Sequence, residues 1–137
     1  MLMKQTALLL GCLILSGLLM AAGVESESAE ATNNCGPVGD NLRGDPERGK
    51  AMHLEHCVAC HGLSGKADVV VMHMDETPRD QSDAELMKTL PDAYLYIAIC
   101  RGGEGVGRSY VMSPWGDYFT DQEIKDLIAW IRTFSAT

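Results

Sequence analysis

Two cysteines three positions apart and an immediately following histidine constrain this chain more than any other feature: Cys57, Cys60 and His61, in the run CVACH. On one helical turn, this spacing projects both sulfur atoms to the same side, where they can form thioethers with two vinyl groups on one edge of a porphyrin. The imidazole then lies under the ring and offers a neutral nitrogen to iron. The motif therefore predicts one covalently attached c-type haem and a chain that folds around it.

Two other readings of the cysteine pair remain. A zinc site would need a second pair of cysteines or histidines, and the remaining candidates are isolated: Cys100, His53, His56 and His73. A thioredoxin-like redox pair would need a strand–helix–strand setting, whereas this pair ends a predicted helix. Both alternatives fit the surroundings of the motif less well than haem does.

The composition of the first 23 residues is not typical of a folded domain. Lys4 precedes an uncharged, leucine-rich run over 5–24, and small residues lead up to Gly23. This pattern predicts a secretory signal peptide cleaved after Gly23, or an uncleaved membrane anchor. A lipid attached at Cys12 is a further alternative. Each outcome places the domain outside the cytoplasm, in the periplasm or anchored to the inner membrane, where thiols can oxidise.

Residues 24–44 are rich in Glu, Ser, Ala and Asn and predict an acidic flexible linker, followed by one domain over 45–137. The whole chain has 11 basic and 19 acidic residues and a net charge of −8. Such a charge argues against nucleic acid and anionic membrane surfaces as partners. Contact with a membrane is expected only through 5–24, if that segment is not cleaved.

Start and stop signals within the domain predict four helices. They cover 46–57 after Asp45, a segment from Ser82 to Leu90, 92–101, and the segment from the capping box at Thr120 to Phe134. The strand-like run over 68–72 has no partner run, and a lone strand is not stable. The sequence therefore predicts an all-α domain. Only 6% of the chain is aromatic, so we expect the haem to complete a core that would otherwise be marginal.

Three separated pieces of the chain together resemble the small monohaem class I c-type cytochromes. Gly49 precedes the motif as in that family, and Gly62 follows it. The glycine-rich run over 100–107 leads to Met112, and the segment 120–130 resembles the family's C-terminal helix. The resemblance covers nearly all of 45–137. It implies a class I cytochrome c fold, with about four short helices around one haem, and a helix crossing between Gly49 and Trp130.

By the same resemblance, Met112 is the second axial ligand of the haem iron, beside His61. His73 is the rival ligand, because imidazole also binds iron well. The remaining methionines near the motif are expected to pack against the ring or the helices: Met72, Met74 and Met87. Arg108, Tyr110 and Trp115 flank the ligand and are candidate contacts for a haem propionate.

Two departures from the family concern the surroundings of His61. His53 occupies a position where the family usually has an aromatic residue, and we expect both His53 and His56 to be solvated or packed at an edge. No proline occurs between His61 and Pro78, so the hydrogen bond that orients the proximal histidine must come from another group.

Cys35 and Cys100 remain after the haem and the leader are accounted for. In an oxidising compartment they are candidates for a disulfide; the alternative is a buried, inert Cys100 and a free Cys35.

These features predict a periplasmic one-electron carrier with a single c-type haem, and not an enzyme. A fixed cytochrome c subunit of a larger membrane, dehydrogenase or oxidase complex is the alternative, and an enzyme or gas sensor with a vacant iron position is a third class. The partners would be redox proteins of unknown identity. An acidic run over 75–85 forms either a solvated face or a steering surface for a basic partner: Asp75, Glu76, Asp80, Asp83 and Glu85, against Arg79.

Overall fold

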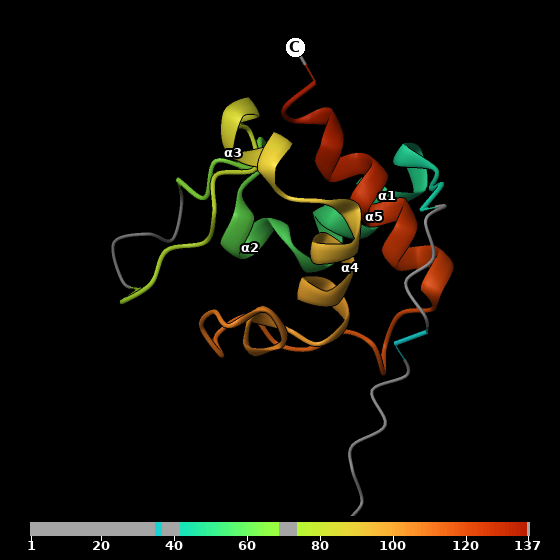
Figure 1. Ribbon diagram of the computed structural model, residues 1–137. Coiled ribbons are helices and arrows are strands. Elements are labelled where there is room, and N and C mark those ends of the chain that lie inside the picture. Colours follow the sequence, from blue (N-terminus) through green and yellow to red (C-terminus); the bar gives the residue numbers. More distant parts are fainter. Residues whose placement is uncertain (1–34, 37–41, 69–73, 137) are drawn as a thin grey trace, which may run out of the picture. The chain divides into compact units, whose positions relative to one another are not determined.

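The computed structural model describes residues 35–36, 42–68 and 74–136, and its regular structure in these ranges is entirely helical (Figure 1). The α-helices are α1 (Pro46–His56), α2 (Val58–His61), α3 (Ala84–Thr89), α4 (Asp92–Cys100) and α5 (Asp121–Thr133), and the 3-10 helix η2 (Gly103–Val106) follows α4. The all-α prediction is confirmed. The strand-like run lies almost wholly outside the described residues. In the described ranges, no helix is long and apolar enough to span a bilayer.

The helix ends follow the signals in the sequence. The Asp45 side chain caps α1 by accepting hydrogen bonds from the amides of Glu47 and Arg48. The capping box predicted for α5 is complete, because the side chains of Thr120 and Glu123 each accept the other's backbone amide. Helix α4 ends one residue before the predicted Arg101, and Gly102 then turns the chain with a φ of +72°.

The start of α3 differs from the prediction. The capping residue is Asp83, whose carboxylate accepts from the Glu85 and Leu86 amides at 3.0 Å each. Ser82, expected to begin a capping box, instead donates its amide and hydroxyl to Asp80. The helix therefore starts one residue later, because Asp80 competes for Ser82.

Helices α1 and α5 cross where Gly49 meets the backbone of α5. A β-carbon at Gly49 would overlap the carbonyl of Asp126 and crowd the amide of Leu127. The predicted partner, Trp130, lies further along α5, where the Lys50 ammonium is 5.4 Å from its ring centroid. Gly49 is thus part of the crossing, as expected, and the atoms nearest to its missing side chain belong to the α5 backbone.

The buried core joins three helices. Helix α4 lies at the centre of Figure 1 and packs against α5. The buried apolar side chains come mainly from these two helices, with one from α3: Leu95, Tyr96, Ile99 and Cys100 from α4, Ile124, Leu127, Ile128 and Ile131 from α5, and Met87. Arg132 of α5 connects the same helices at their edge, by donating to Asp92 and to the carbonyls of Met87 and Leu90.

Parts of the predicted linker lie against the domain. The side chains of Cys35 and Leu42 pack on the core cluster, and the side chain of Gln122 donates to the carbonyl of Arg43. The predicted leader over 1–23 lies outside the described residues. Ordered contacts with the domain therefore begin before residue 45.

Candidate cofactor site

The cysteine motif lies where α1 passes into α2. Cys57 interrupts the helix for one residue, and the amides of Cys60 and His61 both donate to its carbonyl, at 3.2 and 3.0 Å. Gly62, with a φ of +74°, ends α2 directly after the histidine. This tight turn brings Cys57, Cys60 and His61 to the wall of one cavity.

Both motif cysteines are free and half-buried. Burial, together with the neighbouring Cys60, raises the pKa of the Cys57 thiol to about 11. The described part of the chain contains no group of three His, Cys, Asp or Glu side chains able to hold a metal ion. The zinc reading therefore has no support in this part of the chain.

His61 is suited to bind iron as a neutral imidazole. Burial, and to a smaller degree His53, lowers the pKa of His61 to about 4, so the ring carries no charge at neutral pH. Its Nδ1 atom is buried and has no hydrogen-bond partner among the described residues. The expected substitute for the family's proline carbonyl is therefore not found in this part of the chain.

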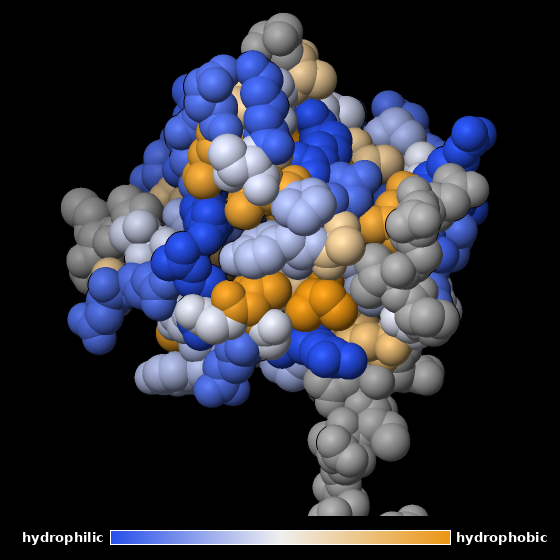
Figure 2. All heavy atoms as spheres, viewed as in Figure 1, coloured by the Kyte–Doolittle hydropathy of each residue, from blue (hydrophilic) through white to orange (hydrophobic). Residues whose placement is uncertain are grey.

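The cavity beside the motif has a volume of about 540 Å³, within the roughly 300–1,000 Å³ typical of cofactor sites. Its walls come from α1, α2, α3, α4, α5 and two loops, over 74–81 and 103–115. Apolar side chains lie in the middle of the face shown in Figure 2, with hydrophilic ones around them. The apolar contacts include Met87, Leu90, Leu95, Ile99, Leu127 and Ile131.

Most of the predicted site residues line this one cavity. They are Cys57, Cys60, His61, Arg108, Met112 and Trp115. Tyr110 is not among the residues that line it, and its side chain is 77% exposed. The rival ligand His73 lies outside the described residues, as does Met72, whereas Met74 and Met87 line the cavity as expected.

Met112 is held by the glycine-rich turn after α4. The Gly103 amide donates to the Met112 carbonyl at 2.9 Å, and the Arg108 amide donates to the Gly103 carbonyl at 2.8 Å. A β-carbon at Gly102 would press on the backbone of the 112–114 segment. The glycines therefore allow a close approach of the two segments, which side chains at these positions would prevent.

The rim of the cavity carries charged and aromatic groups, of which the sequence had indicated only Arg108 as a contact. Arg108 forms an ion pair with Glu76 at 3.6 Å, between the two loops. The Arg79 guanidinium lies 5.6 Å from the Tyr94 ring centroid. Both Glu76 and Arg79 line the cavity, although in the sequence they were visible only as members of a charged run.

The surroundings of His53 differ in part from the prediction. It is fully buried, so the expectation of a solvated ring is wrong, and its ring packs edge-on against Phe134 at 5.4 Å. Burial lowers its pKa. His56 is more exposed and packs against the rings of Phe119 and Trp115. Both histidines line the cavity, which the spacing along α1 relative to Cys57 could have indicated.

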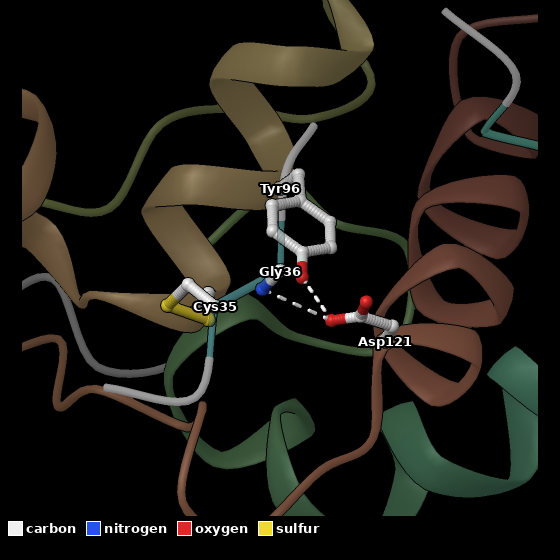
Figure 3. The surroundings of a disulfide bond; sticks show 5 residues. Cys35, Gly36, Tyr96 and Asp121 are labelled. Atoms are coloured by element: carbon white, nitrogen blue, oxygen red, sulfur yellow. Dashed lines mark hydrogen bonds between the residues drawn. A yellow bond between two sulfur atoms is a disulfide. The ribbon is translucent and has the colours of Figure 1, made fainter. Parts of the chain in front are cut away.

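A disulfide joins Cys35 to Cys100, with their Cα atoms 5.8 Å apart (Figure 3). Of the two alternatives left open by the sequence, the structure contains the bonded pair. The bond attaches the segment before α1 to the last residue of α4, close to the turn that leads to Met112.

These features fit a porphyrin group. An apolar cavity of suitable size has two thiols on one turn, a neutral imidazole with a buried orphan Nδ1, and a thioether from a second segment. Softer sulfur and nitrogen donors of this kind suit haem iron.

The comparisons with known proteins agree with this geometry. The sequence model described as cytochrome c matches residues 46–135. Among solved structures, the chain is similar to one described as KustC0563 c-type cytochrome, with a TM-score of 0.53 and 27% sequence identity, over 63% of this chain and 95% of that one. No match was found among the curated proteins.

The family match begins at the first residue of α1 and extends beyond the end of α5, so it includes the cysteine motif, the glycine-rich turn and Met112. The cofactor implied is a covalently bound c-type haem with its iron. The chain therefore belongs to the cytochrome c family, as a class I c-type cytochrome that binds haem and transfers electrons.

Proposed function

We propose that this cytochrome is a one-electron carrier that works outside the cytoplasm, with Cys57 and Cys60 as the thioether attachments and His61 and Met112 as the axial ligands of the iron. The observation that supports this most directly is that all four side chains, from α1–α2 and from the loop after η2, line the same apolar cavity.

The haem supplies an iron that changes its charge by one electron. His61 contributes a neutral nitrogen, and Met112 contributes a soft thioether, which favours the ferrous state relative to a second imidazole. These two side chains would hold the iron and leave no open position for a substrate. The apolar walls limit the access of water, so these residues favour transfer of electrons over binding of a substrate.

The disulfide supports the proposed location. Cys35 and Cys100 are bonded, and structural disulfides persist mainly in oxidising compartments such as the periplasm. The leader, as a cleaved signal or as an anchor, would deliver the domain there. A carrier tied to the membrane and a free carrier share the same haem site.

The test replaces Met112 by Ala in the haem-loaded chain. We expect loss of the sulfur-to-iron absorption band at the red end of the spectrum, a lower midpoint potential and rapid binding of carbon monoxide. Met74→Ala is the matched control, because Met74 lines the same cavity from the loop over 74–81. The Met74→Ala variant should keep the sulfur-to-iron band. An unchanged band in Met112→Ala would show that another residue is the ligand. Stable co-purification with a partner at high salt would favour a fixed subunit over a free carrier.

A further inference from the structure

Five residues around the disulfide connect three segments of the chain; we call them the clasp: Cys35, Gly36, Tyr96, Cys100 and Asp121. Within the clasp, the Asp121 carboxylate accepts the Gly36 amide at 3.4 Å and the Tyr96 hydroxyl (Figure 3). Burial, and then the bond to Asp121, raises the pKa of Tyr96 to about 12, so the hydroxyl remains a donor. The clasp thus fixes the segment before α1 to the end of α4 and to the first turn of α5.

The same end of α4 holds the loop that carries Met112. The Trp115 amide donates to the Ile99 carbonyl at 3.0 Å, and the Gly116 amide donates to the Cys100 carbonyl at 2.9 Å. The carbonyl of Met112 itself accepts the Gly103 amide. The backbone at Met112 and in the segment that follows it is therefore bonded to residues within a few positions of Cys100.

The loop also rests on the disulfide itself. A β-carbon at Gly116 would lie 2.6 Å from the sulfur of Cys100 and 3.2 Å from the sulfur of Cys35. Both distances are shorter than van der Waals contact. The two sulfur atoms thus form a surface against which the Gly116 backbone packs, and only glycine fits there.

We infer that the Cys35–Cys100 disulfide positions Met112 for the iron, through the end of α4 and the Gly116 contact. The inference rests on the proposed assignment of Met112 as a ligand. A thioether is a neutral and weak ligand, so the fraction bound depends on how firmly its loop is held. When the Cys35–Cys100 disulfide is removed, the loop loses the two sulfur atoms against which it packs. Competing ligands then displace the Met112 sulfur from the iron more readily.

The experiment uses the haem-loaded chain with Cys35→Ser and Cys100→Ala together, and follows the sulfur-to-iron band of the ferric protein as the pH rises. Hydroxide and deprotonated lysine compete for iron at high pH. We expect the variant to lose the band at a pH lower by about one unit. This shift corresponds to a roughly tenfold change in the equilibrium between the Met112-bound iron and the iron whose sulfur ligand has been displaced. The midpoint potential of the variant should also be lower.

Asp83→Ala is the control, since it removes the α3 cap and so lowers stability at a position outside the clasp. Its band should be lost at the wild-type pH. If the cysteine double variant keeps the wild-type pH midpoint and potential, while mass confirms that the disulfide is absent, the inference is overturned. If the wild-type protein shows no such band, the ligand assignment has failed instead.

A second variant decides the matter if the double variant does not fold. Gly116→Ala keeps the disulfide and pushes the loop off the two sulfurs, so the band should again be lost at lower pH. Where the double variant folds, the same substitution in that background should have a smaller effect, because the sulfur contacts are gone. A Gly116→Ala protein with the wild-type midpoint would contradict the inference.

Discussion

The imidazole of His53 is fully buried, and neither ring nitrogen has a hydrogen-bond partner among the described residues. Its surroundings are the Phe134 ring and the cavity wall. A buried polar group left without a partner costs about 1–3 kcal/mol. An aromatic hydrocarbon ring would fill this place without that cost.

We therefore predict that His53→Phe stabilises the haem-loaded protein by about 1–2 kcal/mol at neutral pH. Because the pKa of His53 is lowered, the stability of the wild-type protein should also depend on pH. Below about pH 6.5 the unfolded chain protonates this histidine while the folded chain does not, so wild-type stability falls with falling pH. Urea unfolding at several pH values should show a smaller fall in the variant. His56→Phe, on the same helix but more exposed, is the control, and a destabilised His53→Phe would contradict the argument.

Single residues were predictable where the chemistry is local. The roles proposed for Cys57, Cys60 and His61 follow from five consecutive residues. The role proposed for Met112 needed the resemblance to a family, because a methionine alone does not distinguish a ligand from packing. The burial of His53 and the ion pair between Glu76 and Arg108 depend on segments far apart in the sequence. Neither has a local signal.

Among the elements, the crossing of α1 and α5 depends on the missing side chain of Gly49. In an exposed helix, Gly→Ala would stabilise by about 1 kcal/mol. Here the new β-carbon would overlap the Asp126 carbonyl. We predict that Gly49→Ala destabilises the protein by about 1–3 kcal/mol, measured by urea unfolding. Ala51→Gly, at an exposed position of the same helix, reports the effect of helix propensity alone. A stabilised Gly49→Ala protein would show that the helices can move apart without loss.

Arg132 fixes the junction of α3 and α4 to α5. Its guanidinium donates to Asp92 at 2.8 Å and to the Met87 carbonyl at 2.7 Å, and also to the Leu90 carbonyl. We predict that Arg132→Met lowers the free energy of unfolding by about 1–3 kcal/mol, because part-buried carbonyls lose their donors. Lys88→Met removes only an exposed pair with Glu85 and should change stability by less than about 0.5 kcal/mol. Equal effects of the two substitutions would contradict this role of Arg132.

The existence of the elements was more predictable than their details. Capping residues and apolar spacing gave α1, α4 and α5 to within a residue or so. The start of α3 was missed by one residue, since Ser82 and Asp83 can both cap a helix and only the position of Asp80 decides between them. The one-residue break at Cys57 and the 3-10 turn η2 have no signal in hydrophobic periodicity.

For the molecule as a whole, the cavity accounts for much of the interior. Its walls come from five α-helices and two loops. Domains of this size have a net stability of about 5–15 kcal/mol. We therefore expect the fold to depend on a group that fills the cavity.

We predict that the haem-free chain, with its Cys35–Cys100 disulfide intact, unfolds in urea without a cooperative transition and has weak near-ultraviolet circular dichroism. The haem-loaded protein at the same concentration is the reference and should unfold cooperatively. A haem-free chain with an equally steep transition at the same midpoint would show that the helices hold the fold by themselves.

The charge of the molecule sets its long-range behaviour toward redox partners. The net charge is −8, and the loop over 74–81 that borders the cavity contains exposed acids. Some are neutralised locally, as Glu76 is by Arg108. Asp75 has no ion pair within the described residues, so it contributes its full charge beside the site.

We predict that the reduced protein reacts with a cationic oxidant such as hexaamminecobalt(III) more slowly as ionic strength rises, and with ferricyanide more quickly. Each rate should change by about 3–10-fold between about 0.01 and 0.5 M salt. Asp75→Lys should flatten both salt dependences. Glu47→Lys, with the same change of charge at the start of α1, should flatten them less, because only charge near the site of transfer acts strongly within a Debye length. Equal effects of the two variants would show that net charge alone steers the partners and that the acids beside the cavity form an ordinary solvated face.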